Sequence, residues 1–412
     1  MAKVLEGLRV VELSTHVAVP KVGRMMAEWG AEVIKIEPPK GEAYRSTIPG
    51  LWKFPMQDDN NPLFELMNAG GKKSMCLDLK NPNALEAMYK LIGTADIFIT
   101  NTRTKALAKL GLDYETLKVK YPKLIYGVLT GFGEVGPEKD RPGFDITSFW
   151  ARSGVLMDWT LEGNTPPKPT PGFGDCATAS ILLAGLLAAL RSRDLTGEGS
   201  YVTTSLLGTA LWYNDTGVLC GQPQYQKCLG VGPKPRIPDR PLNPLYKTKD
   251  GDWILSSVPE WTLKAPRVMR VLGMDEYIDD PRFADAVVSR EHSPELVPMF
   301  DEAFARTDTE TVLKGFEEND INHSKLSTID ELYKDEQAWA IGSYSEMTLR
   351  CGDKAIYSRP PVKFSAMEQD ELKWAPLLGE HSVEILAELG YSAEEIEKVT
   401  GEGGGIVQYE KK

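Results

Sequence analysis

Residues 8–37, LRVVELSTHVAVPKVGRMMAEWGAEVIKIE, contain two short runs rich in β-branched residues with a helical pattern between them. The runs LRVVEL and AEVIKIE have the length and composition of buried strands, and the segment VGRMMAEWGA has the spacing of an amphipathic helix. A strand, a helix and a second strand in succession predict a βαβ unit, whose two strands lie parallel in one sheet. This stretch therefore predicts an α/β fold with a largely parallel sheet.

The same alternation continues to about residue 135. Further strand patterns are KKSMCLDL, ADIFITN and LIYGVLTGFG, and further helical patterns are NPNALEAMYKLIG and YETLKVKYP. In the first of these helices, Asn81 is a plausible cap and Pro82 the first helical residue. Ligands of such sheets bind at the carboxyl ends of the strands.

Basic residues stand near the predicted strand ends of an otherwise acidic chain. They are Lys72, Lys73, Lys80, Arg103, Lys105 and Lys109. A solvated surface explains them about as well as an anion site does. Their expected location at the carboxyl edge of the sheet slightly favours an anionic ligand.

The composition changes at residues 221–244, GQPQYQKCLGVGPKPRIPDRPLNP, which are dense in Pro and Gly and are typical of a linker or a lid. We expect a first domain over residues 1–220 and a smaller α+β domain over residues 245–335. The smaller domain begins with a predicted hairpin around Asp250-Gly251, a type I′ turn signal. Residues 336–412 end in two helices separated by Gly390, the second with Ser392 and Glu395 spaced as a capping box.

Asp175 stands alone in PGFGDCATASILLAGLLAAL, residues 171–190, between a glycine-rich turn and fifteen uncharged residues. A helix over Cys176–Leu190 would be apolar on every face, so it is predicted to be buried. Asp175 could cap that helix by accepting from the N–H of Ala177 or Thr178. Alternatively, a carboxylate held beside free N–H groups could be a nucleophile.

The composition excludes several functions. A net charge of -12 argues against nucleic-acid and anionic-membrane surfaces. The five cysteines show neither a disulfide framework nor a metal knuckle, and the four histidines are isolated, so we expect no metal site and reduced thiols. No signal peptide or run of 18 apolar residues is present, and we expect a soluble cytoplasmic protein.

One dinucleotide-like motif is present but lacks its context. GFGEVG, residues 131–136, matches G-x-G-x-x-G after a strand, but Pro137 and polar residues follow where a helix is required. Nicotinamide or flavin binding is therefore disfavoured. No G-x-S-x-G elbow is present, which disfavours a serine hydrolase.

Several motifs, in order along the chain, together resemble the class III CoA-transferases, the family of formyl-CoA transferase and carnitine CoA-transferase. The motifs are LEGLRVVELS, AEVIKIEPPKGEAYR, DLKNP, ADIFITNTR, LGLDYETLKVKYPKLIYGVLTGFGEVGP, RPGFD, TGEGSYVTTSL and APLLGEHSVEILAELGY. TRTKAL, DRPGFD and DEQAWA are most similar to the branch that acts on 2-hydroxyacyl-CoA or aryllactyl-CoA in amino-acid fermentation.

The resemblance implies site residues. The nucleophile of the family is an aspartate that follows a G-x-G-D turn and precedes an apolar helix, and Asp175 matches it. The residues that match CoA contacts are Val17, Ala18, Leu77, Asp78, Leu79, Lys80, Asn101, Thr102, Arg103 and Lys109. The sequence departs from the family at Val19, where glycine is usual, and at Pro38, where some members have arginine.

The resemblance further implies that CoA moves between an acyl-CoA and a carboxylic acid, here a 2-hydroxy acid, through an aspartyl anhydride and an aspartyl-CoA thioester. CoA thioesters are the substrate, and no tightly bound cofactor is expected. Backbone N–H groups of the Gly172–Asp175 turn or of GFG could stabilise the tetrahedral oxyanions. A Rossmann-like domain formed by residues 1–220 and 336–412 and an interlocked homodimer are also implied.

Two other functions remain open. An acyl-CoA racemase of the same fold would need an acid/base pair, for which His16 and Asp145 are the candidates. A non-catalytic CoA-binding subunit would need the basic edge but not Asp175. An apolar substrate pocket beside Asp175 is expected, and residues 145–159 offer side chains that either line it or pack the core. They are Phe149, Trp150, Leu156, Met157 and Trp159.

Overall fold

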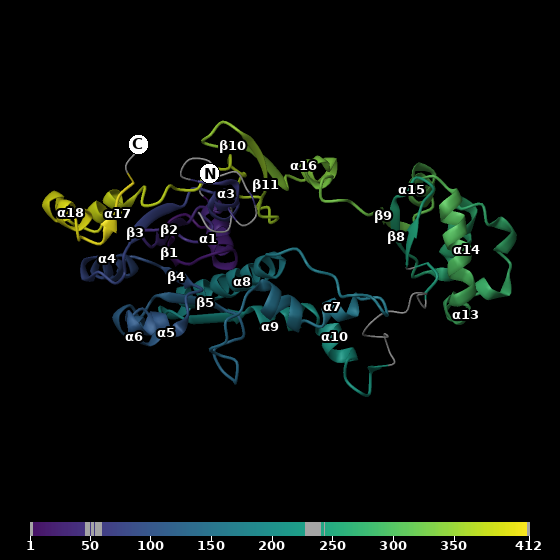
Figure 1. Cartoon of the computed structure of the whole chain (residues 1–412), viewed down its shortest axis with the longest axis horizontal. Helices are drawn as coiled ribbons and strands as arrows, with labels where there is room; N and C mark the ends of the chain where they lie inside the picture. Colours follow the sequence, from purple (N-terminus) through teal and green to yellow (C-terminus); the bar gives the residue numbers. More distant parts are fainter. Residues whose placement is uncertain are drawn as a thin grey trace. The chain divides into compact units, whose positions relative to one another are not determined.

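Two units make up the chain in the computed structural model, which describes residues 3–45, 50, 53, 60–226, 240–242 and 244–409. The first unit contains residues 1–155, 168–219 and 336–412, and the second contains residues 156–167 and 220–335 (Figure 1). Most of the expected linker or lid, residues 227–239 and 243, lies outside the described residues.

A seven-stranded sheet forms the centre of the first unit, in the order β12-β3-β2-β1-β4-β5-β6. The strands are β1 (Arg9–Leu13), β2 (Glu32–Glu37), β3 (Lys73–Leu77), β4 (Ile97–Thr100), β5 (Ile125–Thr130), β6 (Tyr201–Ser205) and β12 (Ile406–Val407). All neighbours pair parallel except β12, which is antiparallel to β3. The predicted parallel sheet is confirmed, and its strand order reverses between β1 and β4, as in a doubly wound fold.

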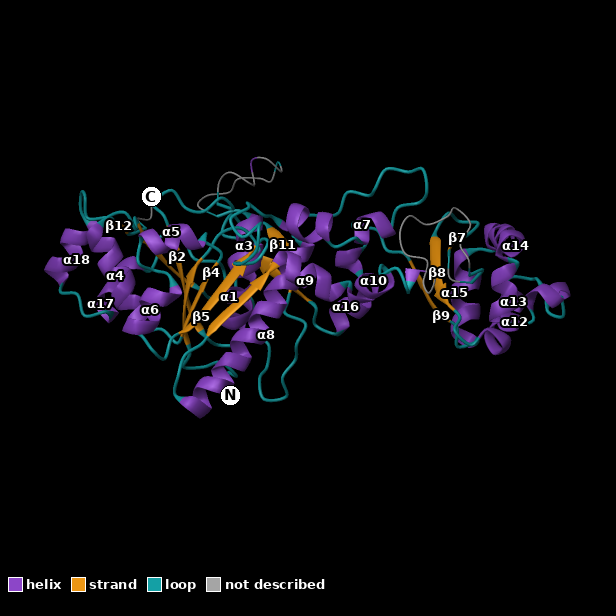
Figure 2. Ribbon diagram, turned by 90° about the horizontal axis from the view of Figure 1, so that it is seen from below, coloured by secondary structure: helices purple, strands orange, loops and turns teal. Residues whose placement is uncertain are grey.

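Helices cover both faces of this sheet (Figure 2). The helices of the first unit are α1 (Ala18–Glu28), α3 (Pro62–Asn68), α4 (Pro82–Gly93), α5 (Thr104–Lys109), α6 (Tyr114–Lys120), α8 (Phe173–Thr196), α9 (Leu206–Tyr213), α16 (Glu336–Ala340), α17 (Ser382–Glu388) and α18 (Ala393–Thr400), with a π-helix at Asp145–Phe149 and a 3-10 turn at Trp150–Arg152. Helices α7 (Val155–Asp158) and α10 (Asp215–Cys220) lie at its boundaries, and β10 (Tyr344–Thr348) and β11 (Lys354–Ser358) form a separate hairpin.

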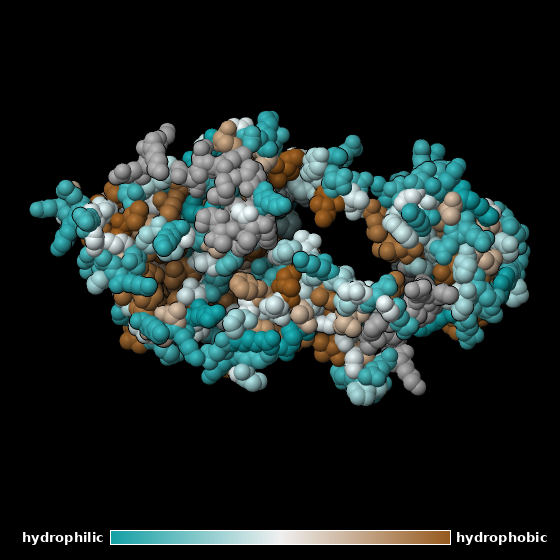
Figure 3. Space-filling view, viewed as in Figure 1, coloured by the Kyte–Doolittle hydropathy of each residue, from teal (hydrophilic) through white to brown (hydrophobic). Residues whose placement is uncertain are grey.

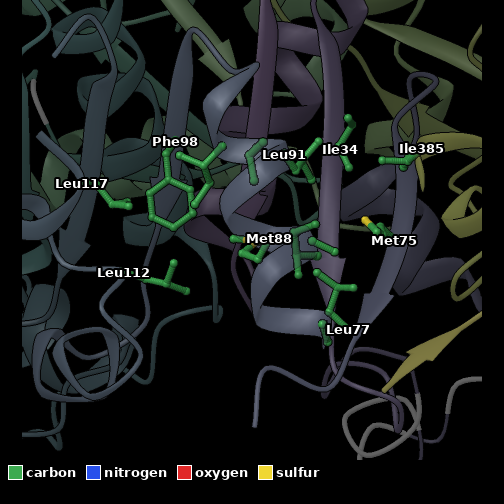
Figure 4. Packing of buried hydrophobic residues seen from close by; sticks show 14 of the residues in the cluster. Ile34, Met75, Leu77, Met88, Leu91, Phe98, Leu112, Leu117 and Ile385 are labelled. Atoms are coloured by element: carbon green, nitrogen blue, oxygen red, sulfur yellow. The ribbon is translucent and has the colours of Figure 1, made fainter. Parts of the chain in front are cut away.

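Helix α4 shows how sequence and packing agree. Asn81 accepts from the N–H of Asn83 and Pro82 begins the helix, as predicted. Figure 4 shows Met88 and Leu91 of this helix among the apolar side chains of the strands, all of which are fully buried. The same core includes residues of α5, α6, α17 and α18. The capping box of α18, with Ser392 and Glu395, is also confirmed.

Helix α8 packs against β5, β6 and α1 on the other face of the sheet. The predicted apolar helix is confirmed, but it begins three residues earlier than expected, and the expectation that every face is buried is wrong. The side chains spaced four apart on one face are exposed in the single chain: Cys176, Ser180, Ala184 and Ala188. By length and composition α8 could cross a membrane, yet its buried face packs as the core helix of a soluble domain does.

The second unit has its own apolar core and a three-stranded antiparallel sheet. Its elements are β7 (Leu245–Lys247), β8 (Trp253–Ser257), β9 (Asn322–Lys325), α12 (Trp261–Val271), α13 (Ala286–Glu291), α14 (Ser293–Arg306), α15 (Thr309–Glu318) and 3-10 turns at Asp275–Tyr277, Pro281–Phe283 and Leu332–Lys334. The predicted hairpin is confirmed by the pairing of β7 with β8. Its connection is not a type I′ turn, because Gly251 has a positive φ and Asp250 does not.

A buried ion cluster joins the first three strands of the sheet. Glu12 of β1 accepts from the ammonium groups of Lys72 at 2.7 Å and Lys35 at 3.1 Å, and all three side chains are fully buried. Lys35 also donates to the carbonyl of Ser14, and Lys72 to the carbonyl of Pro20. The cluster therefore anchors both ends of the loop that follows β1.

The expected location of two basic residues at the carboxyl edge is wrong. Lys72 and Lys73 lie at the amino end of β3, where Lys73 pairs with Glu32, Glu384 and Glu388. The strand begins rather than ends at these residues, although the ammonium group of Lys72 reaches the carbonyl of Pro20 after β1.

Replacement of Glu12 by Gln should lower the free energy of unfolding by about 3 to 5 kcal/mol, because two buried ammonium groups lose their carboxylate. Burial raises the pKa of Glu12, but Lys72 and Lys35 outweigh burial and hold it at about 2, below the ordinary 4.5. The wild type should therefore lose this contribution as the pH falls from 4.5 toward 2, and the variant should not.

Urea unfolding across this pH range measures both effects. Glu86→Gln, which removes the exposed partner of Lys90, is the control and should leave the unfolding midpoint nearly unchanged. Equal effects of the two substitutions would contradict the role of the buried cluster.

Candidate active site

The loops that follow β1 and β4 meet where the strand order of the sheet reverses. Asn101 accepts from the backbone N–H of Thr15 at 3.0 Å and donates to its carbonyl at 2.8 Å, so the two loops are tied together. A cavity of about 590 Å³ opens at this position. Doubly wound sheets bind their ligands at this point of the fold.

Seven residues selected from the sequence line this one cavity. They are Val17, Ala18, Asn101, Thr102, Arg103, Lys109 and Asp175. The other four, Leu77, Asp78, Leu79 and Lys80, do not line it. Leu77 ends β3 and the other three residues follow it, two strands away from β1, and the N–H of Asp78 donates to the carbonyl of Gly405.

The cavity has a strongly basic side. Arg103, Lys105 and Lys109 come from the start and body of α5, and Lys105 pairs with Asp140 at 2.8 Å. Lys139 and Arg141 complete the set and were missed from the sequence. Five cations around one cavity fit an anionic ligand with several charges.

The missed residues belong to the loop between β5 and the π-helix, where no helix follows the GFGEVG motif, as the sequence predicted. The ends of this loop lie in contact: a Cβ on Gly131 would meet the Cα of Gly143 at 2.8 Å. The available signal was the run EKDRPG after a strand whose carboxyl end faces the same edge of the sheet.

His16 lines the cavity from the loop after β1 in a left-handed conformation, with φ of 66°. The carboxylate of Glu42 holds this conformation by accepting from the His16 backbone N–H at 3.0 Å. The imidazole Nδ1 is 2.7 Å from the hydroxyl of Thr15, and the ring makes edge contacts with Tyr44 and Phe144. Burial lowers the pKa of His16, so the ring is neutral at pH 7.

The first turn of α8 places Asp175 at the cavity. Gly172 is the helix cap, with φ of 88°, so the expectation that Asp175 is the cap is wrong. The carboxylate of Asp145 accepts from the backbone N–H of Gly172 at 3.0 Å and of Asp175 at 2.9 Å. The N–H groups of Gly172 and Asp175 are therefore occupied and are not free to stabilise oxyanions.

Gly174 is required at its position in this turn. A Cβ there would meet the Cγ of Phe149 at 2.3 Å and Oδ1 of Asp145 at 2.6 Å. Phe149 and Trp150 are buried beneath the turn. Neither lines the cavity, because both face the core.

Of the residues that could line the expected apolar pocket or pack the core, Phe149 and Trp150 therefore pack the core. Leu156, Met157 and Trp159 belong to the second unit, and Met157 and Trp159 are exposed. The apolar side of the cavity is instead formed by Val17, Ala18, Leu129, Phe144 and Leu206.

The two aspartates are held in a weakly solvated environment. Burial raises the pKa of Asp175 to about 7, and the charge of Asp145 adds to this rise. Burial also raises the pKa of Asp145, whereas hydrogen bonds from the backbone of Gly172, Asp175 and Gly174 lower it. Asp145 does not line the cavity, so the structure does not bring it together with His16 as an acid/base pair.

Comparisons with known proteins show the family to which the chain belongs. The CoA-transferase family III model matches residues 5–382. The (R)-2-hydroxy-4-methylpentanoate CoA-transferase of Clostridioides difficile is 38% identical over 95% of this chain and 97% of its own. The cinnamoyl-CoA:phenyllactate CoA-transferase of Clostridium sporogenes is 36% identical over 98% of each chain.

A solved structure has the same fold over nearly the whole chain. The CAIB/BAIF family protein from Brucella suis superimposes with a TM-score of 0.79 and 27% identity, covering 94% of this chain and 100% of that chain. The doubly wound sheet, the cavity at its switch point and these matches lead to one conclusion: the chain is an enzyme that belongs to CoA-transferase family III.

Proposed function

We propose that this CoA-transferase moves CoA from an acyl-CoA to a 2-hydroxy acid with a branched aliphatic or aromatic side chain, with Asp175 as the nucleophile. The observation that carries the proposal is the placement of Asp175 in a cavity with a basic side and an apolar side. The basic side suits the phosphates of CoA, and the apolar side suits the acyl group. The activities for which the two similar enzymes are named favour a 2-hydroxy acid as acceptor.

The reaction needs only the carboxylate and the two substrates. An oxygen of Asp175 attacks the thioester carbon, the C–S bond breaks, and CoA leaves as the thiolate while the acyl group and Asp175 form a mixed anhydride. The thiolate then attacks the Asp175 carbonyl carbon, which releases the donor acid and leaves an aspartyl-CoA thioester. The acceptor carboxylate attacks this thioester, and the displaced thiolate attacks the new acyl carbon. Asp175 is regenerated and the new acyl-CoA leaves.

The surroundings of Asp175 suit a nucleophile. A carboxylate with a pKa near 7 is weakly solvated and more basic than an ordinary aspartate, yet still ionised in half or more of the molecules at pH 7 and above. The half-buried position beside α1 limits the access of water, which would hydrolyse the anhydride. The rate should therefore fall as the pH drops below about 7.

We infer that the charged part of CoA lies over the start of α5. Arg103 and Lys109 face the cavity, and, within the described residues, no acidic side chain pairs with either. Residues 77–80 follow β3 at the same edge of the sheet, and we propose that they contact the adenosine end of a CoA that extends from the cavity. The distinction matters because CoA is much longer than the cavity.

Wild-type enzyme given an acyl-CoA donor and a panel of acids should form new thioesters preferentially with 2-hydroxy-4-methylpentanoate or phenyllactate, and less with oxalate, acetate, carnitine or lactate. Asp175→Asn should form none of them, because the amide cannot form the anhydride. Mass spectrometry of the thioesters measures both. Hydroxylamine added with acyl-CoA should modify Asp175 in the wild type.

Asp194→Asn, an exposed carboxylate near the other end of α8, is the matched control and should retain wild-type activity. A preference for oxalate or carnitine would contradict the acceptor class but not the transferase. Substantial transfer by Asp175→Asn would refute the nucleophile. Exchange of the α-proton of an acyl-CoA without any transfer would identify a racemase.

Arg103→Ala and Lys109→Ala should each raise the KM for CoA thioesters about 10-fold or more and leave the KM for the acid nearly unchanged, since each loses a charge-assisted contact with phosphate. Steady-state kinetics with each substrate varied measures the split. Lys118→Ala, a lysine of α6 that pairs with Glu115, is the control. Lys80→Ala should weaken CoA substrates but not acyl-pantetheine, which lacks adenosine. Unchanged KM values in Arg103→Ala and Lys109→Ala would place CoA elsewhere.

We also infer that the protein is a cytoplasmic homodimer with interlocked chains. One face of α8 is open in the single chain, and α9 exposes apolar side chains, among them Trp212 at 71%. Figure 3 shows apolar side chains at the surface of both units. A second copy that covers these faces would remove them from water. CoA thioesters suit the cytoplasm, and the described cysteines form no disulfide, which suits a reducing compartment.

Sedimentation equilibrium should give one species of twice the chain mass that does not dissociate on dilution, because interlocked chains cannot separate without unfolding. A Trp212→Lys variant should recover poorly as a dimer after refolding. Leu263→Lys, also an exposed apolar residue, is a control for the effect of charge. A stable wild-type monomer would contradict the dimer, and cell fractionation tests the location.

A further inference from the structure

The carboxylate of Asp145 binds N–H groups at the start of α8, where a carboxylate from α8 itself would be expected to bind. The N-terminus of a helix stabilises anions through its free N–H groups and its dipole. An aspartate in the first turn, as Asp175 is, normally benefits from this effect. Here the N–H groups of Gly172 and Asp175 donate to Asp145, whose side chain comes from the π-helix and is 5% exposed.

Titratable side chains from five elements lie around Asp175 and its neighbour Cys176. Tyr44 follows β2, His16 follows β1, Lys21 belongs to α1, Cys176 belongs to α8, and Asp145 belongs to the π-helix. Tyr44 stays a neutral phenol because burial raises its pKa, and desolvation of the sulfur raises the pKa of the Cys176 thiol although the residue is exposed in the single chain. His16 is neutral at pH 7, as shown above. The basic residues of the cavity are Arg103, Lys105, Lys109, Lys139 and Arg141.

Lys21 and Arg24 of α1 are the cations that act on the neighbouring Cys176 thiol, whose pKa they lower. Among the titratable groups around Asp175, within the described residues, Asp145 is the one that brings a negative charge to it. The same side chain accepts hydrogen bonds from the backbone N–H groups of the first turn of α8. Both the negative charge beside Asp175 and the hydrogen bonding of the first turn of α8 thus depend on Asp145, which does not line the cavity.

We propose that Asp145 is a positioning residue, which fixes the first turn of α8 by binding its N–H groups and thereby prevents the helix N-terminus from stabilising the Asp175 carboxylate. The inference deepens the proposed function, since it rests on Asp175 as the nucleophile. An unstabilised carboxylate is a better nucleophile toward the thioester. It is also held in one orientation, because the backbone N–H of Asp175 is bound.

Two consequences follow for the variant Asp145→Asn. The side chain keeps its size and one acceptor oxygen but loses its charge, and the helix N-terminus becomes available to Asp175. The pKa of Asp175 should fall by about one unit or more. The acid limb of the kcat profile should move to lower pH by the same amount, and kcat above pH 8 should decrease, because a less basic carboxylate attacks more slowly.

The titration is measured directly by infrared difference spectroscopy of the carboxyl band, assigned by its absence in Asp175→Asn. In the wild type the band should titrate near pH 7. A wild-type midpoint near 4 would overturn the proposal without any variant at Asp145. An unchanged midpoint in folded Asp145→Asn would also overturn it.

Asp113→Asn is the matched control, because Asp113 caps α6 by accepting from the N–H of Thr116 at 3.1 Å. It loses the same charge at another helix and should leave the Asp175 band in place. Asp145→Glu restores the charge and should keep the midpoint closer to 7 than Asp145→Asn does. A purely structural role would lower the melting temperature of both Asp145 variants without moving the band.

The infrared titration needs no turnover, so it separates the two proposals. A band that moves in Asp145→Asn while the wild type transfers no CoA would support the effect of Asp145 on Asp175 and refute the proposed function. If the wild type transfers CoA but the band does not move in Asp145→Asn, the proposed function is supported and the effect of Asp145 on Asp175 is refuted.

Discussion

Helix α8 begins inside the protein, and the N–H groups of its first turn must find acceptors there. The side chain of Asp145 supplies them, at 3.0 Å from the N–H of Gly172 and 2.9 Å from that of Asp175. This contact requires a glycine at position 174, since a Cβ would collide with both Asp145 and Phe149. It also requires the long loop after β5 to return to the sheet edge. The position of Asp175, the chemistry proposed for it and one wall of the cavity all depend on this single carboxylate.

The opposite wall depends on a second buried acid. Glu12 binds two lysines that in turn hold the carbonyls of Ser14 and Pro20, and the loop between these residues carries Val17 and Ala18 to the cavity. Buried charges of this kind are costly unless every partner is present. Glu12 and Asp145 fix the backbone on two sides of the cavity before the substrate binds. This lowers the free-energy cost of orienting the proposed nucleophile.

Much of this architecture could be read from local patterns. The alternation of β-branched runs with helical periodicity predicted the first five strands, and Asn81 and Ser392 marked helix starts correctly, because caps and periodicity are set by neighbours in the chain. The order of motifs identified the family, and it singled out Asp175 and six other residues that meet in one cavity. The first βα loop and the loop after β4 were found because parallel strands end at a shared edge.

Other features of the site depend on contacts between segments that are far apart in the sequence, so only the tertiary structure determined them. The partner of the α8 N-terminus lies 30 residues away, and Lys139 and Arg141 reach the cavity only because a loop folds back where two glycines touch. Lys72 and Lys73 fell at the wrong end of β3, since a run of residues does not show at which lysine the strand begins. The sequence by itself determined the βαβ order, the caps of α4 and α18, and the family, and it marked Asp175 as the proposed nucleophile, because these depend on local pattern and motif. The raised pKa of Asp175, the occupied N–H groups and the open face of α8 arose from burial and long-range contacts, which exist only once distant segments pack together.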